Sequence, residues 1–330
     1  MIATPNELLA ALAARGLADA DAPPSDTPTA PTHQRPWYIG LLLGASGWLA
    51  GLFMLGFVAI LFQPTSQPAA ALTGAVLLGA AWGLFRVDRD GAFVAQLALA
   101  LSIAGQCVMI FAINRNDAHL GGVAASALLL QAVLALVMPN AAQRALSAFF
   151  AVIAWVLTVR FALLGEPAFW RASPAFAPSL ATVIAGWALA WAPVLGATWA
   201  LIRFEPAWMA RRWQVVLRPV LAGLVVGLGF ATLASHPFES FHWFGSSPAA
   251  PTWLSLWPLL SALVALAGIA AAFALGDRAL MGVCAVAALL HVSHFYYELG
   301  TSLLLKSLLM LVMGGSMWLA SRRLAKGVRR

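Results

Sequence analysis

The side chains most capable of chemistry in this sequence cluster near its C-terminal end. His291, His294 and Glu298 are three and four residues apart, so a helix would place them on one face. Imidazole and carboxylate groups at this spacing could transfer protons or bind a metal ion. One ion could not readily reach all three, because the helix rise from His291 to Glu298 is about 10.5 Å, whereas metal–ligand bonds are about 2 Å. We therefore predict no metal site and regard His294 with Glu298 as the more reasonable pair.

Tyr297 and Lys306 complete this candidate cluster. The segment Gly300-Thr301-Ser302 suits a tight turn that caps a following helix, so two helices would form a hairpin. Lys306 and His294 would then lie at similar depth, each about 9 Å from the turn. Polar groups inside a membrane are costly, which favours a proton- or anion-handling site near the outer leaflet. The alternative is that Lys306 extends its amine to the membrane surface while the histidines hydrogen-bond to each other.

A second group of candidate residues lies on the same predicted side of the membrane. Arg160 lies near the end of one apolar stretch, and His236, Glu239 and His242 lie in a loop rich in aromatic residues. These residues could join the first cluster in a composite site. The alternative is that the aromatic loop lies on the bilayer surface.

The sequence contains no standard catalytic signature. A Walker A loop, a Rossmann fingerprint, an H-E-x-x-H motif and a G-x-S-x-G motif are all absent. Cys107 and Cys284 are isolated within apolar stretches and form no metal-binding or redox pair. We therefore assign no catalytic residue and expect no cofactor.

The composition determines which elements must position these side chains. Of the 330 residues, 62% are apolar and only 9% are charged. Soluble domains are typically about 45–50% apolar and about 25% charged. So few charges could not cover the surface of a soluble protein of this size. The runs are continuously apolar and lack the alternation of outer-membrane barrels, so we predict an all-α, polytopic bundle of membrane helices.

Ten stretches are long and apolar enough to cross a membrane as helices. Their approximate residues are 38–62, 68–85, 92–113, 119–138, 145–163, 178–202, 217–235, 253–275, 279–297 and 301–321. Together they predict one transmembrane domain over residues 37–321. Before it we expect a short amphipathic cytoplasmic helix within residues 1–17 and a disordered tether over 18–36. After it comes a basic cytoplasmic tail over residues 322–330.

The positive charges indicate the orientation of these spans. Ten spans place both termini on one side, and 15 of the 19 Lys and Arg residues then lie on that side. The positive-inside rule therefore places both termini in the cytoplasm. This asymmetry also explains the net charge of +7, so nucleic acid is not an expected partner. The aromatic and basic segment 208–213, which includes Trp208 and Trp213, is expected to lie at the interface and face anionic lipid.

Small residues repeat at a spacing typical of close helix packing. Gly40 with Gly44 and Gly47 with Gly51 form two GxxxG pairs in the first span, and the spacing recurs at 79/83 and 223/227. Glycines four residues apart allow helix backbones to approach closely. Such faces could meet neighbouring helices of the same chain. The first span could alternatively accept a helix from a partner protein.

Two stretches of the sequence are similar to a known membrane family. One runs from Arg35-Pro36-Trp37-Tyr38 to Gly47-Trp48-Leu49-Ala50-Gly51-Leu52-Phe53, and the other from Phe295-Tyr296-Tyr297-Glu298-Leu299 to Ser302-Leu303-Leu304-Leu305-Lys306-Ser307. With the many-span layout, they resemble the bacterial family catalogued as domain of unknown function 4401, and more distantly its relative 2157, over most of residues 35–325. The resemblance implies an inner-membrane protein with no assigned activity and no established catalytic residues. It also implies a small membrane-anchored partner carrying a GDYXXLXY motif.

Three functions remain open at this point. The first is a non-enzymatic component of the inner membrane that lies in the lipid bilayer and assembles with a partner protein. The second is a secondary transporter or an ion or proton pathway that uses the polar cluster around Lys306. The third is a membrane-embedded enzyme that acts on a lipid or on a periplasmic substrate. The lack of catalytic motifs favours the first.

Overall fold

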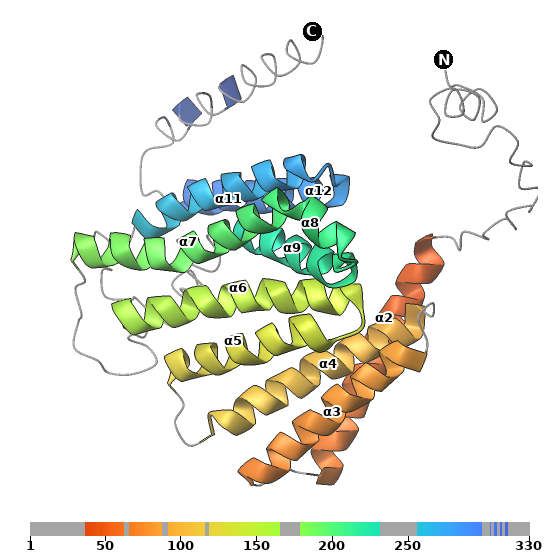
Figure 1. Ribbon diagram of the computed structural model, residues 1–330. Helices are drawn as coiled ribbons and strands as arrows, with labels where there is room; N and C mark the ends of the chain where they lie inside the picture. The colour runs from red at the N-terminus through yellow and green to blue at the C-terminus, as the bar shows by residue number, and fades with distance from the viewer. Residues whose placement is uncertain are drawn as a thin grey trace, which may run out of the picture.

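The computed structural model describes residues 37–62, 66–87, 92–115, 119–165, 179–231 and 256–298, with six isolated positions between 304 and 315. Within these ranges the chain forms helices and no strands (Figure 1), which confirms the all-α prediction. The helices are α2 (Trp37–Phe62), α3 (Gln67–Val87), α4 (Ala92–Ile113), α5 (Leu120–Val137), α6 (Ala141–Leu164), α7 (Leu180–Arg203), α8 (Glu205–Ala210), α9 (Gln214–Gly229), α11 (Leu256–Ala274) and α12 (Arg278–Glu298).

Five of the described helices are long and apolar enough to cross a membrane by length and composition. They are α3, α5, α7, the segment Phe93–Ile113 of α4 and the segment Ala141–Leu163 of α6. Nine of the ten predicted stretches coincide with a helix of the structure, although α9 has only 16 residues in its described part. The tenth stretch, 301–321, lies almost entirely outside the described residues.

The helices pack around two centres. In the N-terminal half, α4 contacts both α2 and α3, and it also contacts α5. In the C-terminal half, α6 and α9 pack together, and α7, α11 and α12 surround α9 (Figure 1). The α5–α6 contact joins the two halves. Most consecutive helices lie side by side, whereas α2 packs on α4 rather than on α3.

The main apolar core lies among α6, α7, α9 and α11. Trp191, Val183, Val156 and Leu228 are almost completely buried there. The indole Nε1 of Trp155 on α6 donates a hydrogen bond of 3.0 Å to the carbonyl of Ala190 on α7. This contact lies one turn before Pro193, whose missing N–H weakens the helical hydrogen bonding of that turn. Packing and hydrogen bonding thus both join α6 to α7.

The outer surface of the described bundle carries many large apolar side chains. Phe53 is 78% exposed, Ile60 74% and Leu129 70%. Apolar patches of this kind are rare on soluble monomers but normal where lipid replaces water. The structure is therefore that of a protein with membrane-type apolar helices.

Two details of the segment between α7 and α9 differ from the sequence expectation. A short additional helix, α8, occupies the stretch expected to be a plain interfacial segment. Trp208 was expected to face lipid, but its side chain is only 6% exposed and its Nε1 donates to the carbonyl of Leu201 at 2.9 Å. Trp213, by contrast, is 59% exposed. Trp208 on α8 is thus directed inward, whereas Trp213, at the N-terminal cap of α9, is directed outward.

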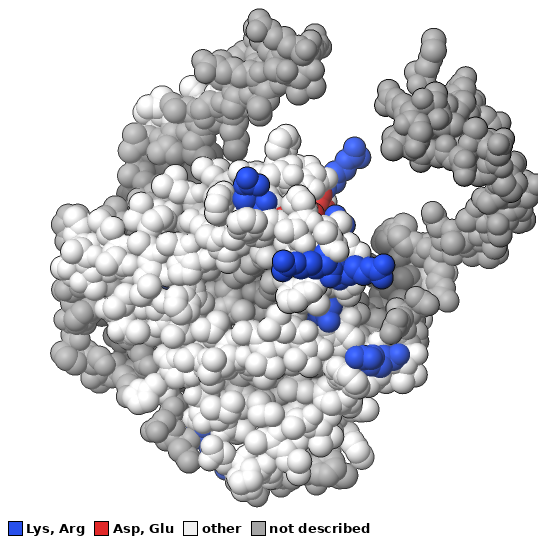
Figure 2. All heavy atoms as spheres, in the orientation of Figure 1, with Lys and Arg blue, Asp and Glu red and all other residues white. Residues whose placement is uncertain are grey.

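Positive charge gathers at one end of the molecule. Figure 2 shows most of the Lys and Arg side chains in view at the end of the bundle that carries α8. Arg218 of α9 lies at this end, 3.5 Å from Glu205 of α8. Arg86, at the end of α3, stacks over the ring of Trp82 at 4.6 Å. On the face in view, the described positive side chains are therefore concentrated near α8.

Candidate functional site

The predicted cluster near the C-terminus is only partly covered by the structure. His291, His294, Tyr297 and Glu298 occupy the last turns of α12, which is helical to Glu298 as the spacing argument assumed. Their side chains, and Lys306 altogether, lie outside the described residues. The cluster therefore stays a prediction.

Only one residue of the second predicted group lies within the described part of the chain. Arg160 lies on α6 and is only 6% exposed, so its side chain is directed into the bundle. His236, Glu239 and His242 lie outside the described residues. The composite site likewise stays a prediction. Among the described residues, no group of three His, Cys, Asp or Glu side chains could hold a metal ion.

Three glycines of α2, Gly44, Gly47 and Gly51, lie against α4. A Cβ atom added to Gly47 would lie 2.8 Å from the carbonyl oxygen of Phe93, and one added to Gly51 would lie 2.5 Å from the Cβ of Ala100. Gly44 is less tightly packed, with Gln96 at 3.5 Å, and no packing is described for Gly40. The close approach of α2 to α4 therefore requires glycine at positions 47 and 51.

The glycines of α3 form two faces with different surroundings. A Cβ added to Gly74 would lie 3.0 Å from the carbonyl oxygen of Gly105 on α4. Gly79 and Gly83, about half a helical turn away around the axis, have no described atom within 4 Å of such a Cβ. The face of α3 that carries Ala75, Gly79 and Gly83 is therefore open, whereas the Gly74 face is filled. We call this the open glycine face.

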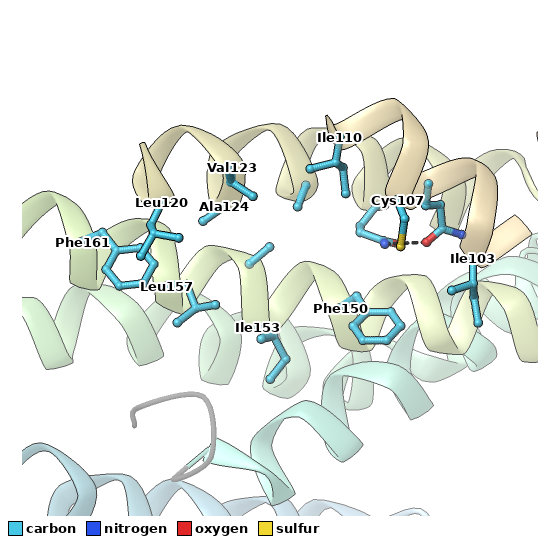
Figure 3. A pocket seen from close by; sticks show the side chains of 14 residues that line it. Ile103, Cys107, Ile110, Leu120, Val123, Ala124, Phe150, Ile153, Leu157 and Phe161 are labelled. Carbon is cyan, nitrogen blue, oxygen red and sulfur yellow. Dashed lines mark hydrogen bonds between the residues drawn. The ribbon is translucent and has the colours of Figure 1, made fainter. Parts of the chain in front are cut away.

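A cavity of about 300 Å³ lies between α4, α5 and α6. Figure 3 shows side chains from all three helices directed toward it. Most of the lining is apolar: Ile103, Ile110, Leu120, Val123, Ala124, Ala127, Phe150, Ile153, Ala154, Leu157 and Phe161. The remaining wall residues are Gln106, Cys107 and Gln131. Mostly apolar walls with a few convergent polar groups are typical of small-molecule sites.

The two cavity glutamines form a buried polar chain. Gln131 is 5% exposed, and its Nε2 donates to the Oε1 of Gln106 at 2.7 Å (Figure 3). Gln106 is 3% exposed, and its Nε2 donates to the Oγ of Ser102 at 2.9 Å. The Oε1 of Gln131 is buried and accepts no hydrogen bond within the described residues. Leaving such an acceptor unpaired costs about 1–3 kcal/mol.

The sequence contained a signal for this pair that was missed. Gln106 lies inside the predicted stretch 92–113 and Gln131 inside 119–138. The predicted site residues included no neutral amide, although a buried amide within a membrane helix also requires a partner. Two glutamines on consecutive predicted helices were therefore a usable signal. Their spacing in the sequence did not show that their side chains meet between α4 and α5.

A second polar group joins α6 to α9. Arg144 lies just before the predicted stretch 145–163, but α6 begins at Ala141, with Asn140 as its cap, and includes it. The side chain is 8% exposed, and its Nη1 donates to the carbonyl of Val215 at 2.7 Å. Next to it, Gln143 donates to Ser147 at 3.1 Å, and its Oε1 has no partner among the described residues.

Residues 36–326 match the model of a domain of unknown function, DUF4401. The chain belongs to the DUF4401 family. No curated protein and no solved structure matches the chain. The matched range includes every described helix, so the family resemblance inferred from the two end motifs is confirmed. The DUF4401 domain thus contains the open glycine face, the cavity and the α12 cluster together.

Proposed function

We propose that this DUF4401 protein is a multi-pass protein of the bacterial inner membrane that acts without catalysis and assembles with a partner protein. In this proposal ten helices cross the membrane and both termini lie in the cytoplasm. The gathering of positive side chains at the α8 end of the bundle supports that orientation, because cytoplasmic segments carry an excess of Lys and Arg (Figure 2).

The open glycine face of α3 is the observation that carries the partner proposal. Membrane helices gain no hydrophobic energy by leaving lipid, so they associate through close backbone packing at small residues. Ala75, Gly79 and Gly83 are spaced by four, and Ala75 and Gly79 are exposed. The GxxxG pairs at Gly47 with Gly51 and at Gly223 with Gly227 are filled by helices of the same chain. Gly56, Gly196 and Gly282 are also open, but none of them has a second glycine four residues away.

The expected partner contributes one transmembrane helix with its own small residues at a spacing of four. The family resemblance suggests the small membrane-anchored protein with a GDYXXLXY motif. Trp82 and Arg86 follow the open glycine face at the basic end of α3 and are both exposed. A carboxylate near the end of the partner helix could pair with Arg86 there.

The test is affinity purification from native membranes with mass spectrometry. Leucine at both positions 79 and 83 (Gly79→Leu with Gly83→Leu) would fill the open glycine face, so we expect the partner to be lost while folded protein is recovered at wild-type yield. Gly56→Leu is the matched control, because Gly56 on α2 also has no described atom within 4 Å. Retention of the same partner by the double variant would contradict the proposal. Loss of a second copy of this chain would assign the face to self-association.

The transport and enzyme hypotheses depend on Lys306 and on the last turns of α12. Both remain predictions, because these side chains lie outside the described residues. Lys306→Met separates them from the partner proposal. If the protein transports or catalyses, Lys306→Met should impair growth as loss of the protein does, while the complex stays intact. If the protein only assembles with its partner, Lys306→Met should change neither growth nor the complex.

A further inference from the structure

The cavity between α4, α5 and α6 is accessible from the outside of the bundle. Two of its wall residues, Cys107 and Phe150, are exposed. In a membrane these side chains face hydrocarbon, so a molecule entering beside them comes from the lipid phase. The volume of about 300 Å³ is roughly twice the ~150 Å³ of an engineered cavity that takes up benzene. The cavity therefore has room for a membrane-soluble molecule larger than a single ring.

Gln131 gives this cavity a specific chemical requirement. The Nε2 of Gln131 donates to Gln106, and the Nε2 of Gln106 donates to Ser102. The Oε1 of Gln131 is therefore the acceptor at the free end of this chain of hydrogen bonds. Successive hydrogen bonds polarise one another and strengthen the terminal acceptor. That acceptor belongs to a side chain that is 95% buried and has no partner among the described residues. Gln131 lines the cavity, so a small shift of its side chain would bring this acceptor within reach of a hydrogen-bond donor on a bound molecule.

The depth of Gln131 restricts which molecule can supply the donor. Gln131 lies about 16 Å along α5 from Leu120 and about 9 Å from Val137. Phospholipid headgroups remain in the interfacial layers and do not reach the interior of the hydrocarbon. A charged donor at this depth is costly. The donor must therefore be a neutral group attached to an apolar molecule.

We propose that this cavity binds a neutral, apolar molecule with one hydroxyl or N–H group, which donates a hydrogen bond to Oε1 of Gln131. The apolar walls hold the body of the molecule, and Gln131 selects for the donor. This site is independent of the open glycine face, which lies on a different helix. Long-chain alcohols, phenols and quinols belong to the class of ligand that fits.

The experiment uses the full-length chain with Cys284→Ala, reconstituted in lipid nanodiscs. Cys107 is then the sole thiol of a chain that has two, and it lies in the cavity wall. The rate of its labelling by N-ethylmaleimide is measured with 4-butylphenol, which can donate, and with 4-butylanisole, which cannot. We expect the phenol to protect Cys107 at a concentration about three- to tenfold lower than the anisole, as one added hydrogen bond predicts.

Two variants show whether Gln131 causes that difference. Gln131→Leu removes the acceptor and should bring protection by the phenol to the level of the anisole. Gln143→Leu is the matched control, because Gln143 is also buried with an unpartnered Oε1 but does not line the cavity, and it should keep the full difference. Variants are compared only if they elute as a single species. Equal protection by the two probes in the parent protein, or protection by neither, would overturn the proposal.

Discussion

Two glycine pairs with the same spacing have opposite surroundings in this protein. Gly223 and Gly227 on α9 are covered by α6, where an added Cβ on Gly223 would overlap the carbonyl oxygen of Ala145. Gly79 and Gly83 on α3 have no described neighbour at all within 4 Å of an added Cβ. The α9 pair packs closely because α6 presents small residues such as Ala148 opposite it. A GxxxG pair therefore marks a surface that permits close approach, and the opposing helix decides whether that surface is used.

Tolerance of leucine at the filled position Gly223 would most directly contradict the contrast between the two glycine faces. In Gly223→Leu the side chain would overlap the α6 backbone, which cannot move as a flexible side chain can. We expect destabilisation of about 3 kcal/mol or more, or no folded protein. Thermal unfolding of the detergent-purified chain measures this. An unfolding midpoint equal to that of Gly79→Leu would show that the two faces do not differ.

A similar contrast between filled and open surroundings applies to two arginines. Arg144 is buried and bonded to the carbonyl of Val215, whereas Arg218 is 63% exposed at its side chain and 3.5 Å from Glu205. Arg144→Met should destabilise the bundle by about 2 kcal/mol, because it removes a charge-assisted bond and leaves a carbonyl unpaired. Arg218→Met should change stability by no more than about 0.5 kcal/mol. Denaturant titration measures the loss of unfolding free energy in each variant. Equal losses would contradict the argument from burial.

Alanine substitutions on α2 sharpen the comparison within one helix. Gly51→Ala places a methyl group against Ala100 and should destabilise by about 1 kcal/mol. Gly56→Ala adds the same group in open space and should stabilise by about 0.5 kcal/mol, because alanine favours helix. The two changes in unfolding midpoint should therefore have opposite signs. Two changes of the same sign would mean that helix propensity outweighs packing at both positions.

The smallest expected loss of stability is at the open glycine face. The pair Gly79→Leu with Gly83→Leu should not lower the unfolding free energy of the isolated chain, because leucine favours helix more than glycine does and meets no described atom there. The same pair should remove the partner from native membranes. A large loss of stability in detergent would show that this face packs within the chain.

The helices could be predicted closely because their signal is local. Nine of ten expected stretches coincide with helices, and the family match over residues 36–326 agrees with the motifs near Arg35 and Lys306. The errors occurred where local signals conflict with packing. Arg144 lies just outside the predicted stretch 145–163, yet it belongs to α6 and donates a hydrogen bond to the carbonyl of Val215. Trp208 was expected to face lipid, yet it packs inward.

The sequence by itself determined the class of protein, the positions of the helices and the unequal distribution of positive charge. Each of these depends on composition or on neighbours along the chain. Tertiary structure alone decided that Gln106 and Gln131 meet, that the face of Gly223 is filled, and that the face of Gly79 is open. Those facts depend on which helix lies opposite, and a membrane helix is apolar on nearly every side. Hydrophobicity therefore cannot indicate its neighbours, and only the packed bundle does.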